Sequence, residues 1–318
     1  MCARFLRKAL IEVLPTRIGL PVALERQGHR SIAFRAHQVD GVKVVIKLTR
    51  GRNSYPEEQW VYHEYARAQV PVPRVLYYSA SLPGIGCPCL VMTMIDGVPL
   101  FDADTPNIGL YGEVGEMLGK MHTVALPAAR FGLGAFLPSA TEWYHSWPAF
   151  VTAQHAHPTS GEYLRRHGLW PDCAEDLTLL SAKNSAHHFR CVLNHGDFGP
   201  DHILVRAGQI AGVIDPGECF AGPPEYDLAH IALYISECQL RQVLNHYPGQ
   251  LDLEMVHVYA AVIALHKAGR AHRESNAVRA NSFAVIARHH CLLINQQDAP
   301  TPGTKLSCGL PSGRYTEI

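Results

Sequence analysis

The feature that most limits the fold of this chain is a hairpin signal near its beginning. Asp40-Gly41 separates the segments AFRAHQV and VKVVIKL, which are both rich in apolar and β-branched residues. An Asp-Gly pair between such segments predicts a tight β-turn, because the centre of the turn needs positive φ. Side chains alternate along a strand, so Lys47 shares one face with positions 43 and 45, and the apolar positions 44, 46 and 48 share the other.

The hairpin belongs to a larger N-terminal unit. Residues 1–17 carry charges among apolar positions and predict an amphipathic helix, and residues 24–50 contain three extended segments. A helix over residues 57–69 ends before the segment VPVPRV, because proline disfavours helical backbone in the residue before it. A strand over residues 89–95 then leads into the turn DGVPL. Residues 1–95 therefore predict a small α+β unit with an antiparallel sheet.

The remainder of the chain is predicted to be mainly helical. Apolar residues recur at helical spacing over residues 111–124, and further helices are expected over residues 224–246, 254–268 and 282–295. Two short strands, HILV and IAGVI, lie between them. We expect residues 96–297 to form the second unit. Residues 298–318 are rich in Pro, Gly, Ser and Thr and are expected to be disordered.

Composition excludes several classes of partner. The 28 basic side chains balance the 28 acidic ones, so no basic field would attract nucleic acid or an anionic membrane. The longest apolar run, residues 258–265, is far shorter than the ~20 residues of a spanning helix. Nine cysteines are scattered without a disulfide pattern. We therefore expect a soluble, reduced, cytoplasmic protein whose ligands are held by local arrangement.

The densest group of ionisable side chains lies in LNHGDFGPDHILV, residues 193–205. It contains His195, Asp197, Asp201 and His202. A structural zinc site is one interpretation, because His187, His188 and Cys191 lie just upstream. Their spacing fits none of the paired zinc patterns. No G-x-S-x-G segment supplies a serine nucleophile, so the sequence gives little support to a hydrolase.

A second carboxylate changes the interpretation. A loop, a strand, a turn and a strand lead from Asp197 to Asp215, so the hairpin can bring the two carboxylates together at one end. One could accept a proton while the other holds a divalent cation. Phosphoryl transfer needs this combination, since its catalysis is mainly positioning and charge neutralisation. Lys47, on the earlier strand, could then reach the phosphates.

The order of these segments resembles the aminoglycoside phosphotransferase and choline kinase-like branch of the protein-kinase fold. NHGDFGPDHILV is similar to the H-G-D catalytic loop of that family, and VIDPGECFAGPPEYDLA to its I-D-x…Y-D-L-A segment. VVIKL, VPVPRVL, LVMTMIDGVPL and LGKMH match earlier landmarks in order, over residues 15–295. FGLGAFLPSATEWYHSWPAF also resembles the corresponding part of hygromycin phosphotransferases. The resemblance implies a bilobal α+β fold, with a sheet-containing N-lobe for nucleotide and a helical catalytic C-lobe.

The resemblance also implies a role for each matching residue. Asp197 would accept or orient the proton of a substrate hydroxyl, Asp215 would bind Mg²⁺, and Lys47 would contact phosphate. Glu58 is the expected partner of Lys47, with Glu57 and Glu64 as competitors.

Other positions are expected around the nucleotide and the loop. Backbone groups of Thr93 and Met94 would face the adenine edge, with Met92 and Met94 either lining the pocket or packing in the core. The nucleotide loop offers only Gly28 and the hydroxyl of Ser31. His195 is expected to brace the catalytic loop. Asp227 is expected to cap and anchor its own helix.

The sequence departs from the family at two places. His202 stands where the family has Asn as second metal ligand, and Gly222-Pro223-Pro224 replaces G-D-P. Imidazole is a softer ligand than an amide oxygen and must be neutral to bind metal. We therefore expect Mn²⁺ to be tolerated alongside Mg²⁺, and activity to fall below about pH 6. The alternative is a His202 that only packs within the loop.

These features predict a kinase that transfers phosphate from ATP or GTP to a hydroxyl of a small molecule. D-F-G and A-P-E segments are absent, which favours a small acceptor over a protein. An aminoglycoside-type antibiotic is the leading acceptor; a metabolite such as an amino alcohol or sugar, and a degraded kinase that only binds nucleotide, are the alternatives. Candidate acceptor contacts are Glu218, Asp201 and Glu225, and the aromatic residues 143–147.

Overall fold

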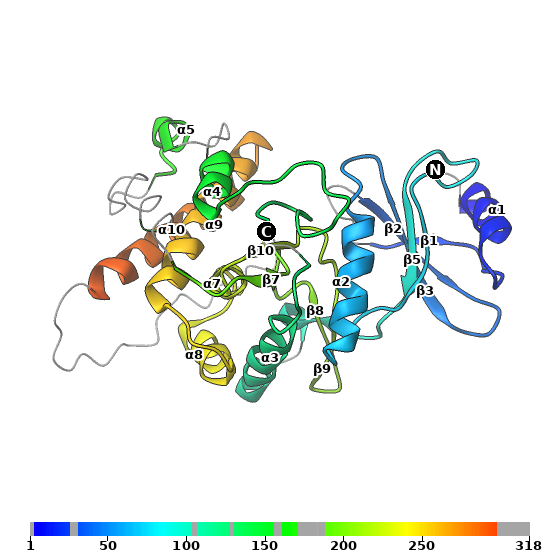
Figure 1. The fold of residues 1–318 in the computed structure, drawn as a ribbon, viewed down its shortest axis with the longest axis horizontal. Coiled ribbons are helices and arrows are strands. Elements are labelled where there is room, and N and C mark those ends of the chain that lie inside the picture. The colour runs from blue at the N-terminus through cyan, green and yellow to red at the C-terminus, as the bar shows by residue number, and fades with distance from the viewer. Residues whose placement is uncertain are drawn as a thin grey trace.

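The fold was analysed in a computed structural model that describes residues 3–25, 31–103, 107–127, 130–155, 161–170, 183 and 188–297. A β-sheet flanked by two helices forms one end of the molecule, and a group of helices forms the other (Figure 1). This is the α+β arrangement that the sequence predicts. Gly28 and the tail over residues 298–318 lie outside the described residues.

The N-terminal sheet has five strands in the order β1-β2-β3-β5-β4, and all neighbouring pairs are antiparallel. The strands are β1 (Val22–Ala23), β2 (Ser31–His37), β3 (Lys43–Thr49), β4 (Val75–Ser79) and β5 (Cys89–Thr93). The predicted hairpin joins β2 to β3. Its loop has three residues, 39–41, closed by Gln38 N–H donating to the Val42 carbonyl at 2.8 Å, and Gly41 has the positive φ of 87°.

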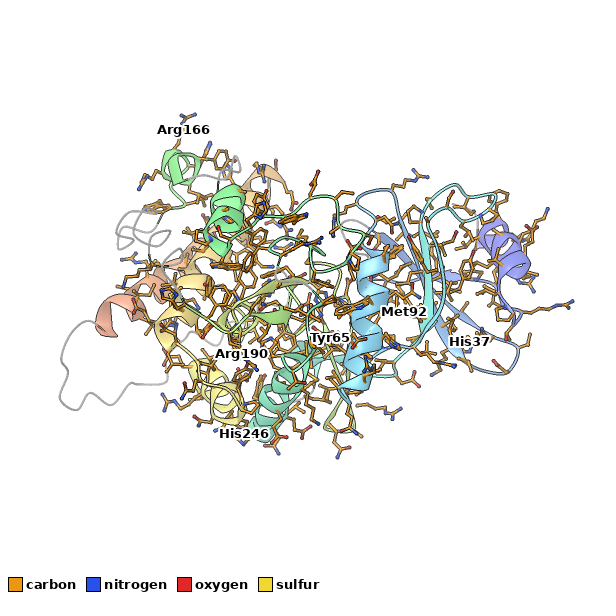
Figure 2. All side chains as sticks on the ribbon, viewed as in Figure 1. His37, Tyr65, Met92, Arg166, Arg190 and His246 are labelled. Atoms are coloured by element: carbon orange, nitrogen blue, oxygen red, sulfur yellow. The ribbon has the colours of Figure 1, made fainter. Side chains whose placement is uncertain are left out.

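The two faces of β3 pack against different helices. Val44, Ile46 and Leu48 are buried with Leu6 and Leu10 of α1 (Ala3–Val13). The opposite face packs against α2 (Tyr55–Arg67), where Met92 lies in a cluster with aromatic residues of that helix (Figure 2). The alternation predicted for β3 is therefore confirmed, and it turns Lys47 toward α2.

The second half is built from helices around one large apolar core. They are α3 (Ile108–Met121), α4 (Trp147–His155), α5 (Gly161–Arg166), α7 (Glu225–Ala232), α8 (Glu237–His246), α9 (Leu253–Arg273) and α10 (Ala277–Gln297), with a 3-10 turn η1 (Leu100–Asp102). The helix predicted over residues 224–246 is wrong, because the structure has two helices there. Ser236 starts the second one with a reciprocal cap, in which it and Gln239 satisfy each other's backbone N–H groups.

The described residues also form two small sheets, which lie between the N-terminal sheet and the helices (Figure 1). β6 (Val98–Pro99), β8 (Ile203–Arg206) and β9 (Gln209–Val213) form one small sheet, and β7 (Val192–Asn194) pairs with β10 (Phe220–Gly222). The two strands predicted after the histidine-rich segment are β8 and β9. They hold residues 195–202 at one end and Asp215 just beyond β9. In the part of the chain that the structure describes, no helix combines the length and apolarity needed to cross a bilayer.

Candidate active site

On the side of the site that the N-terminal sheet forms, the central residue is Lys47. Its Nζ donates to both carboxylate oxygens of Glu58, at 2.8 and 2.9 Å, and to Asp215 Oδ1 at 2.6 Å. Burial disfavours a charged amine, but the carboxylates of Asp215 and Glu58 raise the pKa of Lys47 above its ordinary value. Lys47 is therefore a fixed cation at physiological pH.

The predicted choice of Glu58 agrees with the contacts of α2. Glu58 is fully buried on the side of the helix that faces β3. Its competitors have other partners: Glu57 accepts from Arg52 at 2.6 Å, and Glu64 pairs with Arg67 at 3.0 Å. Pairing with Glu58 limits the positions that the amine of Lys47 can take.

Asp215 follows β9 in a strained backbone conformation. Its φ of 63° is uncommon for a residue with a side chain, and its N–H donates to the hydroxyl of Tyr62 on α2 at 2.9 Å. Burial opposes its ionisation, but Lys47 and His202 lower the pKa of Asp215 to about 2. The carboxylate is thus ionised, and it lies between Lys47 of the sheet and His202.

Asp197 lies in the loop between β7 and β8, with its carboxylate bound on one side. Oδ1 accepts from Nε2 of His230 at 3.0 Å and lies 3.5 Å from Nζ of Lys267. Burial would raise the pKa of Asp197, but these two neighbours hold it well below its ordinary value. The side chain is 38% exposed. An ionised carboxylate that is held at one oxygen and partly exposed can orient a hydroxyl group and receive its proton.

His202 lies between the two aspartates. Its Nδ1 donates to the backbone carbonyl of Asp197 at 2.7 Å, which fixes the proton on that nitrogen in the neutral ring. Nε2 is then the acceptor, and it lies 3.9 Å from Asp215 Oδ2. Two ligands of one Mg²⁺ lie about 3 to 4 Å apart, because each bond is about 2.1 Å long. The pair therefore fits a shared divalent cation.

Protonation competes with that use of His202. Burial favours the neutral ring, but three neighbouring carboxylates, first that of Asp201, raise the pKa of His202 above its ordinary value. A cation bound at Nε2 must therefore displace a proton in acid. This agrees in direction with the predicted loss of activity at low pH, which remains a prediction.

Asp227, which is predicted to cap its own helix, holds the backbone of the loop that carries Asp197. Its carboxylate instead accepts from the N–H groups of His195, at 2.7 Å, and Gly196, at 3.0 Å, and contacts His122 Nε2 at 3.3 Å. His195 in turn contacts the Ile214 carbonyl through Nε2 at 3.0 Å, which ties the loop to the end of β9. Asp227 therefore positions the loop, and the capping prediction is wrong.

The backbone N–H groups of the two expected hinge residues, Thr93 and Met94, already donate hydrogen bonds to neighbouring backbone carbonyls. Thr93 N–H donates to the Arg74 carbonyl and Met94 N–H to the Lys43 carbonyl, both at 2.9 Å. Among the backbone groups of these two residues, the carbonyls therefore remain as possible contacts with an adenine. Met92 is buried in the core against α2. Ser31 is the first residue of β2, opposite Thr49, and its predicted contact with nucleotide stays a prediction.

The candidate acceptor residues divide into two groups. Asp201 is 57% exposed, with Oδ2 at 3.7 Å from His202 Nε2, and the backbone of Glu218 lies against Gly196 of the catalytic loop. Glu225, by contrast, is buried, and its Oε1 accepts from Asp252 N–H at 3.0 Å. Its predicted place in the acceptor cleft is therefore wrong.

The aromatic residues of segment 143–147 also differ in their exposure. Trp147 is buried and stacks on Phe220 with ring centroids 6.0 Å apart. Trp143 and Tyr144 remain partly exposed. Trp143 and Tyr144 can therefore offer a surface to a ligand, whereas Trp147 cannot.

The zinc interpretation finds no support among the described residues. No three His, Cys, Asp or Glu side chains in that part of the chain converge on a point where a metal ion could bind. His187 lies outside the described residues. Mg²⁺ differs in this respect, because it commonly uses one or two protein ligands together with substrate phosphates and water.

Two residues that contact Asp197 were not identified from the sequence. His230 lies three residues after Asp227 on α7, which places both on one side of that helix. The helical spacing could have suggested His230. Lys267 comes from α9, which packs against α7, and nothing local in its sequence marks it.

Comparisons of the sequence with known proteins identify a family and a relative. The sequence profile of the phosphotransferase enzyme family matches residues 26–257. Hygromycin-B 4-O-kinase of Escherichia coli is 25% identical over 239 residues, covering 73% of this chain and 67% of that protein.

Solved structures of known proteins have a fold similar to that of this chain. A thermostable mutant of aminoglycoside phosphotransferase APH(4)-Ia, in a ternary complex with AMP-PNP and hygromycin B, has a TM-score of 0.69 at 22% identity and covers 93% of this chain and 99% of that one. Macrolide 2'-phosphotransferase from Brachybacterium faecium has a TM-score of 0.60 at 18% identity, covering 90% and 97%. The kinase-like fold implied by the sequence is thereby confirmed.

Proposed function

The chain belongs to the phosphotransferase enzyme family, and on that basis we propose that it transfers the γ-phosphate of ATP or GTP to a hydroxyl group of a small molecule. The observation that supports this most strongly is the triple contact of Lys47 with Glu58 and Asp215. It brings a phosphate-binding cation beside a metal-binding carboxylate. His202 links that carboxylate to Asp197.

Each residue has a defined task in this proposal. Lys47 binds phosphate oxygens, and Glu58 keeps its amine in position. Asp215 and His202 would hold Mg²⁺, which supplies positive charge for the phosphates when bound. Asp197 orients the acceptor hydroxyl through its partly exposed carboxylate. It receives the proton as the new O–P bond forms and the bond from the γ-phosphorus to the leaving oxygen breaks. Asp227 keeps the loop in place for that step.

The acceptor that we propose to test first is an aminoglycoside-type antibiotic. The 25% identity to hygromycin-B 4-O-kinase supports it. Asp201 and Glu218 are the carboxylates that would meet the ammonium groups of such a substrate. The burial of Glu225 leaves fewer acidic groups for a polycation. That observation favours an alternative acceptor with fewer charges, such as a sugar or an amino alcohol.

The experiment is a phosphate-transfer assay with ATP and with GTP. The panel contains hygromycin B, other aminoglycosides, macrolides, sugars and amino alcohols, and products are detected by mass. A phosphorylated aminoglycoside would support the leading proposal, and a phosphorylated sugar or alcohol the alternative. Absence of any product together with absence of Mg²⁺-dependent nucleotide binding would reject the kinase function and leave a degraded member of the family.

A further inference from the structure

Among the residues that the structure describes, Lys267 is a charged group at Asp197 to which the proposed function gives no task. It lies on α9, its side chain is only 14% exposed, and its Nζ is 3.5 Å from Asp197 Oδ1. The ring of Tyr234 lies 5.8 Å from the same amine. The packing of α9 against α7 therefore brings a largely buried cation to the catalytic carboxylate.

Two donors share this one carboxylate oxygen, and they differ in rigidity. His230 contacts Oδ1 at 3.0 Å through a ring that is only 4% exposed. Lys267 contacts it at a longer distance, at the end of a flexible four-carbon chain. Because His230 also contacts Asp197 Oδ1, the carboxylate keeps a contact at this oxygen when Lys267 moves away.

The donors also differ in charge. Burial and the nearby Lys267 lower the pKa of His230, so its ring is neutral at physiological pH. The amine of Lys267 is the donor that carries a positive charge. Lys47 has a different position, since it lies on β3 and is held there by Glu58. A second cation is therefore available from the acceptor side of the site.

We propose that Lys267 is a further catalytic residue, whose amine moves from Asp197 onto the phosphoryl group during transfer. This rests on the proposed kinase function. The acceptor hydroxyl must lie within hydrogen-bond distance of Asp197, and the phosphorus must lie one forming bond from that hydroxyl oxygen. The equatorial phosphoryl oxygens then come within about 3 to 5 Å of the carboxylate. That is the space that Lys267 Nζ can reach.

The chemical benefit follows from where charge develops. As the bond to the leaving oxygen breaks and the bond to the acceptor oxygen forms, negative charge is spread over three equatorial oxygens. A cation that approaches from the acceptor side complements Lys47 on the nucleotide side. Loss of one such donor in other enzymes lowers turnover about 10²–10³-fold. We expect a loss of this size for Lys267→Met.

The first test uses a probe that does not depend on the acceptor. An ATP derivative with an acyl group on its γ-phosphate reacts with a nearby amine, which forms an amide as ATP leaves. We expect peptide mapping to find the acyl group on Lys47 and Lys267, with unmodified ATP preventing both reactions. Label on Lys47 alone would overturn the inference and leave the kinase function intact. Label on neither lysine would reject nucleotide binding at this site, and the inference with it.

The second test separates catalysis from folding. Lys267→Met, Lys267→Arg and the matched control Lys120→Met on the exposed surface of α3 are compared for kcat, nucleotide Kd and thermal unfolding, with the acceptor identified by the panel. We expect Lys267→Met to have a lower kcat than wild type and an unchanged nucleotide Kd. We expect the kcat of Lys267→Arg to be at least tenfold higher than that of Lys267→Met. Wild-type kcat in Lys267→Met would contradict the inference. So would a parallel loss of kcat in Lys120→Met.

Discussion

Lys47 Nζ lies 2.6 Å from Asp215 Oδ1, which joins a strand of the N-terminal sheet to the end of β9 in the second half of the chain. Both groups have a proposed ligand, phosphate for the amine and a divalent cation for the carboxylate. In the protein alone each serves as the counter-charge of the other. On the proposed function, binding of a metal–nucleotide complex would replace this ion pair with two separate interactions.

Removal of the amine tests this relationship. Lys47→Met should weaken binding of Mg²⁺·ATP or lower kcat by about ten- to a hundredfold, because a charge-assisted hydrogen bond contributes about 1.5–3 kcal/mol. Calorimetric titration gives the affinity, and the phosphate-transfer assay gives kcat. Lys43→Met is the matched control, since Lys43 lies on the same face of β3 but pairs with exposed Asp96. Equal effects of the two substitutions would contradict the assignment of Lys47.

His202 is expected to control which metal supports activity. Replacement by Asn substitutes an amide oxygen for the imidazole nitrogen, and Mg²⁺ prefers oxygen ligands. The ratio of activity with Mn²⁺ to activity with Mg²⁺ should therefore fall in His202→Asn. Metal titrations at fixed ATP measure this ratio. Superimposable titrations in wild type and variant would show that His202 only packs within the loop.

Asp227 is expected to contribute to both stability and activity. Its buried carboxylate accepts from two backbone N–H groups of the catalytic loop and contacts His122. In Asp227→Asn, an amide NH₂ group faces at least one of these donors, which should lower the free energy of unfolding by about 2–4 kcal/mol. Chemical denaturation measures this change. Asp252→Asn, which preserves the N-cap of α9, is the control and should be nearly neutral.

Because of a pair of histidines, the folded protein is expected to lose stability in acid. His257 Nδ1 lies 3.0 Å from His290 Nδ1, so one ring donates and the other accepts. Burial, followed by the nearby His289, lowers the pKa of His257 to about 4. Below the unfolded value of about 6.5, the unfolded chain binds more protons than the folded one, so stability is complete above that pH and decreases as the pH falls toward 4.

Comparison with a variant measures this contribution. Between pH 6.5 and 4, wild type should lose about 2 kcal/mol more than His257→Asn, a value reduced from the full shift because the ring is partly exposed. Urea unfolding at several pH values provides the data. Identical pH profiles for the two proteins would mean that His257 is protonated without cost in the folded state.

Local patterns in the sequence were sufficient to predict much of the fold. The Asp-Gly loop and the alternation of β3 predicted the hairpin and the direction of Lys47, because strand periodicity depends on neighbouring residues only. The choice of Glu58 among three nearby carboxylates came from family resemblance, and the contacts of α2 agree with it. The break between α7 and α8 was missed because Ser236 and Gln239 form a cap inside an otherwise helical apolar pattern.

The remaining features depend on contacts between distant parts of the chain. Lys267 reaches Asp197 only because α9 packs on α7, and no local pattern encodes that contact. The prediction for Asp227 was wrong for the same reason. An acidic residue in the first turn of a helix is typical of a cap, but the partners of Asp227 belong to a loop that precedes the helix by many residues. Glu225 likewise is held by the backbone N–H of Asp252, a residue well beyond it in the sequence.

The most direct test of the account is turnover of the wild-type protein compared with Asp197→Asn under saturating Mg²⁺ and ATP, with nucleotide affinity measured in parallel. We expect kcat for the acceptor to fall about 10²–10⁴-fold, because the variant lacks the group that receives the hydroxyl proton. The nucleotide Kd should change less than about threefold, since Lys47 and Asp215 are intact. Undiminished phosphate transfer by Asp197→Asn would contradict the central claim.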